Sequence, residues 1–458
     1  MAVMSNLLVL PDLREMLSEH DDVGLAQVVT ELHPATIADF SEGLSVEETW
    51  QLLDHAPVAR QAEILTFFAT AKQVEMVTGA GRHLISKLLE AMPHDDRVEL
   101  LRQLDPEVVE DLLPLVAKAD REDIRRLLSY PEDSAGAMMT TDYAWLSRDL
   151  TVAQAIEDVR KQASDKETIY YIYVLDENRR MLGFVSLRHL ILAKLTAKID
   201  DIMQTEVISV RVDADREEVA RLLQRYDFLA IPVVDDQHRL VGIITHDDAI
   251  DVVVEEATED ALHQAGVATI DESYIDAPFR TIWRKRAIYL AGFFVAEAVL
   301  VTSAMNHFEA AISAVVVLAS FIPLCISTGG NSGAQAATLI TRALAVGDVT
   351  IKDWWRILKH ELWMGLALGS TVGIVGFVFA SLTPNSVLEG INRWTLGLVI
   401  GLSVACICLW GTVLGSMLPL LFKRAGIDPG YASSPFVATL VDATGIIIYF
   451  SFAQLFLL

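Results

Sequence analysis

The charge of this chain is divided at about residue 283, and this division constrains the fold more than any other feature. The sequence carries 62 acidic and 36 basic residues. Eight of the acidic and ten of the basic residues lie from residue 283 onward, so that part is close to neutral and residues 1–282 are strongly acidic. The mean hydropathy of +0.37 is therefore an average over two unlike halves. We expect several domains, with a soluble part followed by a membrane part.

Five apolar stretches in the second part are each long enough to cross a hydrocarbon core of about 30 Å. They cover roughly residues 287–305, 310–328, 362–382, 395–421 and 435–458. With a cytosolic N-terminus, Arg393 is the one basic residue on the outer flanks, and the others lie on the inner flanks. This asymmetry follows the positive-inside rule, and the first residues lack the basic leader of a signal peptide. We expect an α-helical transmembrane bundle in the inner (plasma) membrane, with the N-terminus cytosolic and the C-terminus outside.

The composition of the soluble part excludes several function classes. A strongly acidic surface repels nucleic acid and anionic lipid headgroups but attracts cations, and it equally serves solubility.

The three cysteines, Cys325, Cys406 and Cys408, lie in apolar stretches and form neither a disulfide framework nor a metal-binding spacing. The sequence shows no nucleophile–base set, so we expect no catalytic residues and no enzymatic activity.

The soluble part itself contains two kinds of pattern. Residues 1 to about 130 carry apolar residues at three- and four-residue spacing between proline turn signals, which is typical of short helices. Residues 138–251 hold two copies of one order: strand, helix, strand, turn, strand. The ends of the copies, 171–183 and 230–242, align turn for turn. This repeat resembles a tandem pair of CBS domains, which are α/β units that bury each other's sheets.

Residues 248–282 are expected to form a long connecting helix with acidic residues on one broad face. Like charges at three- and four-residue spacing destabilise a helix by roughly 0.2–0.5 kcal/mol per pair, and a bound cation would compensate. A solvated helix face explains the same pattern. The acids concerned are Asp248, Asp251, Glu255, Glu256, Glu259 and Asp260.

Asp442 is the one ionisable residue deep in the last apolar stretch. A charged side chain at the bilayer centre costs roughly 2.5–3.5 kcal/mol on insertion scales, so such a residue usually faces water or an ion; a protonated structural aspartate is the alternative. Mg²⁺ keeps several waters and contacts one or two carboxylates, so two copies of Asp442 on a dimer axis would suit it. Glu297, in the first stretch, is left unassigned between a pathway residue, a paired acid and a protonated one.

A glycine-rich run follows Pro323 and leads to Asn331. It lacks the lysine of a phosphate-binding loop. Pro323 inside a span predicts a broken helix whose carbonyls line a cavity. Close packing of small residues between helices explains the same glycines.

Four segments carry a resemblance to a known family. They are YPEDSAGAMMT (130–140), EEATED (255–260), TGGNSGAQAATLITRALAVGDV (328–349) and DPGYASSPFVATLVDATGIIIYFS (428–451). On these motifs the chain resembles the MgtE family of Mg²⁺ channels and transporters over nearly its whole length. The resemblance implies an all-α superhelical N domain that senses Mg²⁺ (1–130), tandem CBS domains (131–250), a plug helix with its connection (251–282) and a five-helix pore domain (283–458).

The resemblance also implies roles for individual residues. Asp442 matches the pore carboxylate, and Asn331 and Ala438 match positions next to the pore ion. The helix at 248–265 matches a plug at the cytosolic mouth of the pore. The implied regulatory acids are Asp95, Asp248, Asp251, Glu256, Glu259, Asp260 and Asp428.

Some members of the family also bind ATP between the CBS domains. The usual nucleotide signature is a glycine followed by Ser or Thr and, three residues later, Asp. Copy two keeps it as Gly242, Thr245 and Asp248, whereas copy one has His189 in the place of the aspartate. This departure leaves ATP binding open, with Tyr170 and Arg188 as further contacts.

Together these observations predict a homodimeric, Mg²⁺-selective membrane channel or transporter for Mg²⁺ influx, gated by cytosolic Mg²⁺ through its acidic domains. Two alternatives stay open at this point. One is a broader divalent cation transporter that also carries Co²⁺ or Mn²⁺. The other is a CBS nucleotide sensor that is tethered to a membrane bundle. The implied ligands are Mg²⁺ and ATP, and the implied partners are the lipid bilayer and a second copy, with no nucleic acid.

Overall fold

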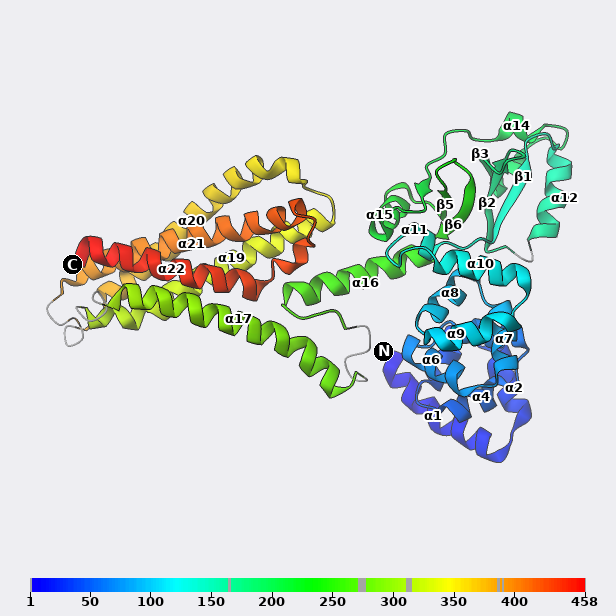
Figure 1. Ribbon diagram of the computed structural model, residues 1–458, viewed down its shortest axis with the longest axis horizontal. Coiled ribbons are helices and arrows are strands. Elements are labelled where there is room, and N and C mark those ends of the chain that lie inside the picture. The colour runs from blue at the N-terminus through cyan, green and yellow to red at the C-terminus, as the bar shows by residue number, and fades with distance from the viewer. Residues whose placement is uncertain are drawn as a thin grey trace. The chain divides into compact units, whose positions relative to one another are not determined.

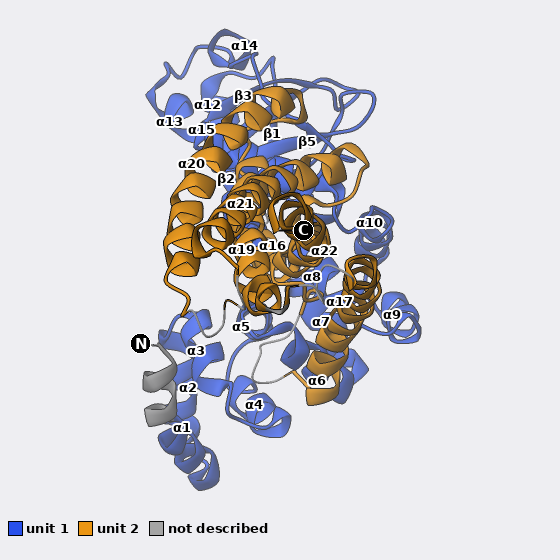
Figure 2. Cartoon of the chain, turned by 90° about the vertical axis from the view of Figure 1, so that its left-hand side faces the viewer, with its two compact units in different colours: residues 1–254 blue, residues 255–458 orange. Residues whose placement is uncertain are grey.

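The computed structural model describes residues 2–163, 166–270, 277–309, 315–384, 388 and 391–457. The chain folds into two compact units, Met1–Val254 and Glu255–Leu458, which Figure 2 colours separately. Each unit is described by itself below.

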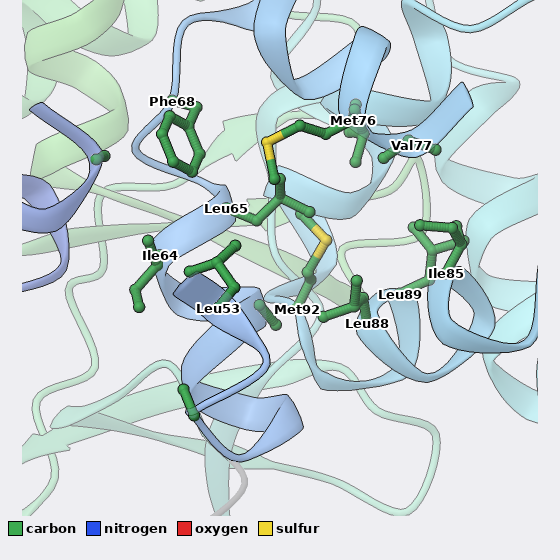
Figure 3. Close-up of a cluster of buried hydrophobic side chains, with 14 of the residues drawn as sticks. Leu53, Ile64, Leu65, Phe68, Met76, Val77, Ile85, Leu88, Leu89 and Met92 are labelled. Carbon is green, nitrogen blue, oxygen red and sulfur yellow. The ribbon is translucent and has the colours of Figure 1, made fainter. Parts of the chain in front are cut away.

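The first part of unit 1 consists of short helices, as predicted. Their starts follow local sequence signals: the Ser45 side chain and Glu48 form a capping box at one helix, and Pro106 stands at the first turn of another. Figure 3 shows Leu53, Leu65 and Met92 within the core that these helices share. The helices are α1 (Ala2–Glu19), α2 (Asp22–Glu31), α3 (Pro34–Ser41), α4 (Val46–Leu53), α5 (Val58–Leu65), α6 (Thr70–Gly79), α7 (Arg82–Ala91), α8 (His94–Arg102), α9 (Pro106–Leu112), η1 (Leu113–Leu115) and α10 (Lys118–Leu128).

The second part of unit 1 contains two three-stranded sheets, ordered β1-β2-β3 and β4-β5-β6. In each sheet the first pair of strands is parallel and the second pair antiparallel, so the predicted repeat is confirmed. The elements are α11 (Ala135–Met138), β1 (Tyr143–Ser147), α12 (Val152–Gln162), β2 (Thr168–Leu175), β3 (Met181–Ser186), α13 (Leu187–Leu192), α14 (Ile199–Ile202), β4 (Val210–Arg211), α15 (Arg216–Tyr226), β5 (Ala230–Val234), β6 (Leu240–Thr245) and α16 (His246–Gln264).

The two copies bind each other by matched exchanges of backbone hydrogen bonds. Phe184 and Gln204 exchange N–H···O bonds of 3.0 and 2.9 Å, and Thr140 and Ile243 do the same at 2.9 Å. Gly183 precedes Phe184 in β3, and Gly242 precedes Ile243 in β6. A Cβ on Gly183 would lie 2.5 Å from the Gln204 carbonyl oxygen, and one on Gly242 would lie 2.8 Å from that of Thr140. The glycines are therefore required by the close approach of the opposite copy.

Helix α16 is shorter than the predicted connecting helix. It ends at Gln264, and Gly266 follows in a left-handed conformation with φ of +70°. Glycine adopts this conformation without steric cost, which is why it terminates helices. The stretch from residue 265 to 270 is not helical, so the expectation of one helix over 248–282 is wrong beyond Gln264. Residues 271–276 lie outside the described residues.

Among the described residues of unit 2, four helical segments are long and apolar enough to cross a membrane: Phe279–His307, Ile351–Ser381, Arg393–Arg424 and Ser434–Leu457. They agree with four of the five predicted spans. The elements of this unit are α17 (Phe279–His307), η2 (Val316–Phe321), α19 (Ile322–Ala345), η3 (Ile351–Asp353), α20 (Trp354–Ser381), α21 (Arg393–Arg424), η4 (Pro429–Tyr431) and α22 (Ser434–Leu457). Figure 1 labels its α-helices.

The remaining predicted span, 310–328, does not coincide with a described helix, because the helix in this region, α19, covers Ile322–Ala345. Residues 310–314 lie outside the described residues, the 3₁₀ helix η2 follows, and α19 begins at Ile322. Pro323 stands in the first turn of α19, where its missing N–H costs no hydrogen bond, and the glycine-rich run continues as unbroken helix. The predicted helix break between Pro323 and Asn331 is therefore wrong.

Gly329 and Gly333 of this run pack directly against the backbone of α21. A Cβ on Gly411 would lie 2.3 Å from the carbonyl oxygen of Gly329, and one on Gly415 would lie 2.1 Å from that of Gly333. Two glycines four residues apart on each helix thus allow the backbones to touch, as small residues do in membrane helix pairs. This glycine seam, formed by Gly329, Gly333, Gly411 and Gly415, confirms the packing alternative.

Candidate functional site

A groove of about 530 Å³ lies between α19 and α22. Asp442, Asn331 and Ala438, which the sequence analysis placed next to a pore ion, all line it. The structure therefore brings the three predicted pore residues together. The complete lining consists of Pro323, Ile326, Ser327, Gly330, Asn331, Ala334, Ser434, Pro435, Ala438 and Asp442.

Helical periodicity explains why these residues share one groove. On α22, Pro435, Ala438 and Asp442 are spaced at three and four residues and lie on one face. A Cβ on Gly330 of α19 would lie 3.4 Å from Oδ1 of Asp442 and 3.5 Å from Cβ of Ala438. Small residues thus keep space beside the single carboxylate of the groove. The Asn331 amide and the nearby hydroxyls suit a cation that retains its water.

A second group of predicted residues meets around His263, near the start of unit 2. Nδ1 of His263 lies 2.7 Å from Oδ2 of Asp428, and Nε2 lies 3.6 Å from Oε1 of Glu259. The imidazole stacks on Tyr431 with ring centroids 4.4 Å apart and is 5% exposed. Glu259 and Asp428 are thus joined through a buried histidine that sequence reasoning missed. Its position one helical turn after Glu259 was the available signal.

The other two acids predicted for this group, Glu256 and Asp260, lie on α16 close to Glu259. Glu256 is three residues before it and Asp260 one residue after it. The hydrogen bonds and ion pairs described for His263 involve Glu259, Asp428 and the hydroxyl of Thr269.

A third group of acids lies within unit 1, where α8 faces the start of α16. Oδ1 of Asp95 is buried and accepts no hydrogen bond from any described residue. Burial, followed by the carboxylate of Asp248, raises the pKa of Asp95 well above its usual range. Burial, followed by the carboxylate of Glu99, raises the pKa of Asp96 to about 7. Carboxylates packed this closely favour a bound cation or a proton.

The acids of α16 experience the same environment from the other side. Burial raises the pKa of Asp248 to about 7, although Thr245 donates a 2.7 Å hydrogen bond to its carboxylate. Burial, followed by the charge of Asp247, raises the pKa of Asp251. The predicted residues Asp95, Asp248 and Asp251 therefore belong to one acidic region, the α8–α16 acids. Asp96 and Asp247 belong to it too, and sequence reasoning missed both.

The described residues hold no group of three or more His, Cys, Asp or Glu side chains already arranged around one metal position. The acids are near each other but are not in a coordination geometry.

The five residues predicted to contact a nucleotide come from both copies of the repeat, Tyr170 and Arg188 from copy one and Gly242, Thr245 and Asp248 from copy two. Gly242 packs against Met139 and Thr140, and Asp248 accepts the Thr245 hydrogen bond. Tyr170 is 61% exposed, and Arg188 is exposed on α13. A groove of about 170 Å³ between the two copies carries four aromatic side chains. It is lined by Tyr171, Tyr173, Phe184, Gln204, Glu206, Val207, Ile208, Phe228, Ala230 and Pro232.

Comparison with protein-family models gives matches in the helical N-terminal part, in both repeat copies and in the membrane part. Residues 322–452 match the MgtE model, described as a divalent cation transporter. Residues 32–133 match the MgtE intracellular N domain, and residues 135–195 and 199–255 match CBS domains. The chain is 38% identical to the magnesium transporter MgtE of Thermus thermophilus over 97% of its own length and 98% of that protein. The chain belongs to the MgtE family.

Further similarities agree with this membership. The chain is 31% identical to the magnesium transporter MgtE of Bacillus subtilis, over 94% of its own length and 93% of that protein. A crystal structure of the cytosolic domain of the Mg²⁺ channel MgtE in complex with ATP superposes with a TM-score of 0.51 and 37% identity. It covers 53% of this chain and 99% of that structure.

Membership in the MgtE family confirms the predicted family and fold class, with a helical N domain, tandem CBS domains and helices that can span a membrane. Because the family is one of cation transporters, it also confirms that the chain is not an enzyme. In an MgtE protein, the α19–α22 groove with its single carboxylate is the natural candidate for the ion pathway.

Proposed function

We propose that this chain carries Mg²⁺ across the membrane through the α19–α22 groove, with Asp442 as the carboxylate that the hydrated ion contacts. One observation carries the proposal: Asp442 lines a groove together with Asn331 and Ala438, and small residues keep space beside it. A carboxylate within a span is costly unless it faces water or an ion. The inward direction follows from the membrane potential, worth about 2.3 kcal/mol per charge per 100 mV.

We propose that the working pathway contains two copies of the chain. The groove has one carboxylate and is lined by two helices, whereas Mg²⁺ is held by one or two carboxylates and waters. A second copy facing the groove would supply the other Asp442 and enclose the ion. The same arrangement places the cytosolic N-terminus of both copies on one side, as the basic flanks predict.

We further propose that cytosolic Mg²⁺ closes the pathway by binding at two acidic regions. The α8–α16 acids carry raised pKa values because their charges are buried together, and Mg²⁺ would remove that repulsion. Glu259 and Asp428 form the second region around His263, with Glu256 and Asp260 close by on the helix. Moving a gate from 1:99 to 99:1 needs about 5.5 kcal/mol of differential binding, which several such sites would provide together.

ATP is proposed as a second ligand of the CBS pair. Support comes from the solved relative that contains ATP and from the aromatic groove of Tyr171, Phe184 and Phe228, whose rings offer stacking surfaces to a base. Tyr170 and Arg188, on the same copy as Tyr171, are the proposed further contacts. His189 in place of an aspartate predicts weaker ribose recognition on this side.

The test is Mg²⁺ uptake into proteoliposomes by the full chain and by Asp442→Asn, which has nearly the same volume. We expect uptake to be lost in a folded Asp442→Asn protein. Glu309→Gln, two residues after the end of α17, should keep it. Full uptake by Asp442→Asn would remove Asp442 from the pathway. Uptake in the presence of competing Co²⁺ or Mn²⁺ then tests the broader divalent reading, because the matching family model is described only as a divalent cation transporter.

A further inference from the structure

Glu297 is an acidic residue in the middle of α17, and nothing in the proposed pathway uses it. It does not line the α19–α22 groove. Among the described residues, no Lys, Arg or His forms an ion pair with it. An unpaired carboxylate inside a membrane span marks a functional position by default.

We propose that Glu297 is a second carboxylate of the ion pathway, which attracts divalent cations to Asp442 and thereby sets the concentration at which transport saturates. The inference rests on the proposed function, since it takes Asp442 as the ion-contacting residue. It adds a residue on a different helix that neither the family motifs nor the groove identifies.

The register of α17 against α22 brings the two acids to one level. Phe293 lies against Phe436, with ring centroids 6.2 Å apart, and Phe308 stacks on Phe450 at 5.3 Å. Because both numbers rise together, the two helices run in the same direction. Glu297 is four residues beyond Phe293 and Asp442 is six beyond Phe436. At 1.5 Å per residue the two carboxylates differ in height by only about 3 Å.

The electrostatics agree with this register. Among the described titratable groups, Glu297 is the one whose charge acts on the carboxylate of Asp442. Figure 1 shows α17 beside α22, and the contacts between the two helices agree with this view. Two like charges in a medium of low dielectric repel each other strongly. A divalent cation near Asp442 reverses that repulsion, because it attracts both.

The charge of Glu297 is expected to change how often a cation occupies the site at Asp442, and not the route that the cation takes. A site lined by charges of one sign raises the local cation concentration by about 10–10³-fold, and we take the lower end for a single carboxylate. Removing it is therefore expected to raise the Mg²⁺ concentration for half-maximal uptake by about tenfold, with a maximal rate within about a factor of two of the native rate. The difference should shrink at high ionic strength, because salt screens charges that are not in contact.

The experiment measures uptake by the full chain in proteoliposomes as a function of external Mg²⁺ for Glu297→Gln, Glu297→Asp and Glu309→Gln. We expect the tenfold shift for Glu297→Gln alone. Glu297→Asp keeps the charge and should restore the native concentration dependence, which a packing role would not do. Glu309→Gln removes one charge just after the end of α17 and should change nothing. If Glu297→Gln is not recovered folded, Glu297→Thr removes the charge with a hydroxyl that can bond to its own helix.

The outcomes separate this inference from the proposed function. A native half-saturation in a folded Glu297→Gln or Glu297→Thr protein overturns it, as does a fall in maximal rate alone. If Asp442→Asn abolishes uptake while Glu297→Gln is native, only the role of Glu297 fails. If Asp442→Asn retains full uptake, the pathway through Asp442 fails first, whatever Glu297 does.

Discussion

The glycine seam between α19 and α21 makes a specific prediction for Gly415→Ala. The added methyl group would lie 2.1 Å from the carbonyl oxygen of Gly333, 2.8 Å from its carbonyl carbon and 2.9 Å from its Cα. All three atoms belong to the backbone, so no side chain can rotate away. The substitution can be accommodated only if one helix moves.

The size of the effect follows from that distance. A carbon atom normally approaches a carbonyl oxygen no closer than about 3.3 Å, so α19 and α21 must separate locally by about 1.2 Å. Overpacking of this kind costs about 1–3 kcal/mol, while alanine returns up to about 1 kcal/mol as the better helix former. We expect a net loss of about 1–2 kcal/mol, or about 2–8 °C in the midpoint of thermal unfolding for a unit of this size.

The assay is thermal unfolding of the purified protein in detergent, followed by tryptophan fluorescence. Gly292→Ala is the matched control, because it makes the same change in α17, where a Cβ would meet nothing within 4 Å. We expect Gly292→Ala to unfold at or slightly above the native midpoint. A Gly415→Ala midpoint within about 1 °C of that control would refute the close backbone contact, because the expected steric cost lowers the midpoint by more than that.

Two further predictions concern the acidic regions. In EDTA the midpoint of thermal unfolding should fall as pH rises from about 4 to 7 and then level off. Asp96 and Asp248 have pKa values of about 7 in the folded chain and about 3.9 in the unfolded chain, so the folded state binds more protons in this range. Mg²⁺ should raise the midpoint more at pH 8 than at pH 5, and an equal rise at both pH values would contradict this. His263→Ala should lower stability by about 1–3 kcal/mol by leaving Asp428 without its 2.7 Å partner, measured by the same unfolding assay with His307→Ala as the control.

Much of the fold was predictable because its signals are local. Hydropathy identifies α17, α20, α21 and α22, since each presents a long apolar run. The alternation of strand and turn identifies both CBS copies. The position of α19 was not predictable in this way, because its groove and seam require Gly, Ser and Asn, which lower the hydropathy of the helix that carries them.

The candidate site was predictable where one residue carries the signal and not where a pair does. Asp442 is recognisable alone because a carboxylate in an apolar span is costly. His263 is recognisable only with Asp428, which is 165 residues away. The meaning of Gly329 and Gly333 likewise depends on two glycines in another helix. Asp96 looks like a surface acid until its burial against α16 is known.

The paired glycines of the CBS copies bear on how such a duplicated module changes over time. Gly183 and Gly242 each make room for the backbone of the opposite copy, and neither depends on a ligand. The neighbouring positions that are proposed to contact a nucleotide have diverged, since His189 in one copy corresponds to Asp248 in the other. After a duplication, mutual packing therefore preserves the scaffold of both copies, and each copy is free to lose or exchange its ligand chemistry independently.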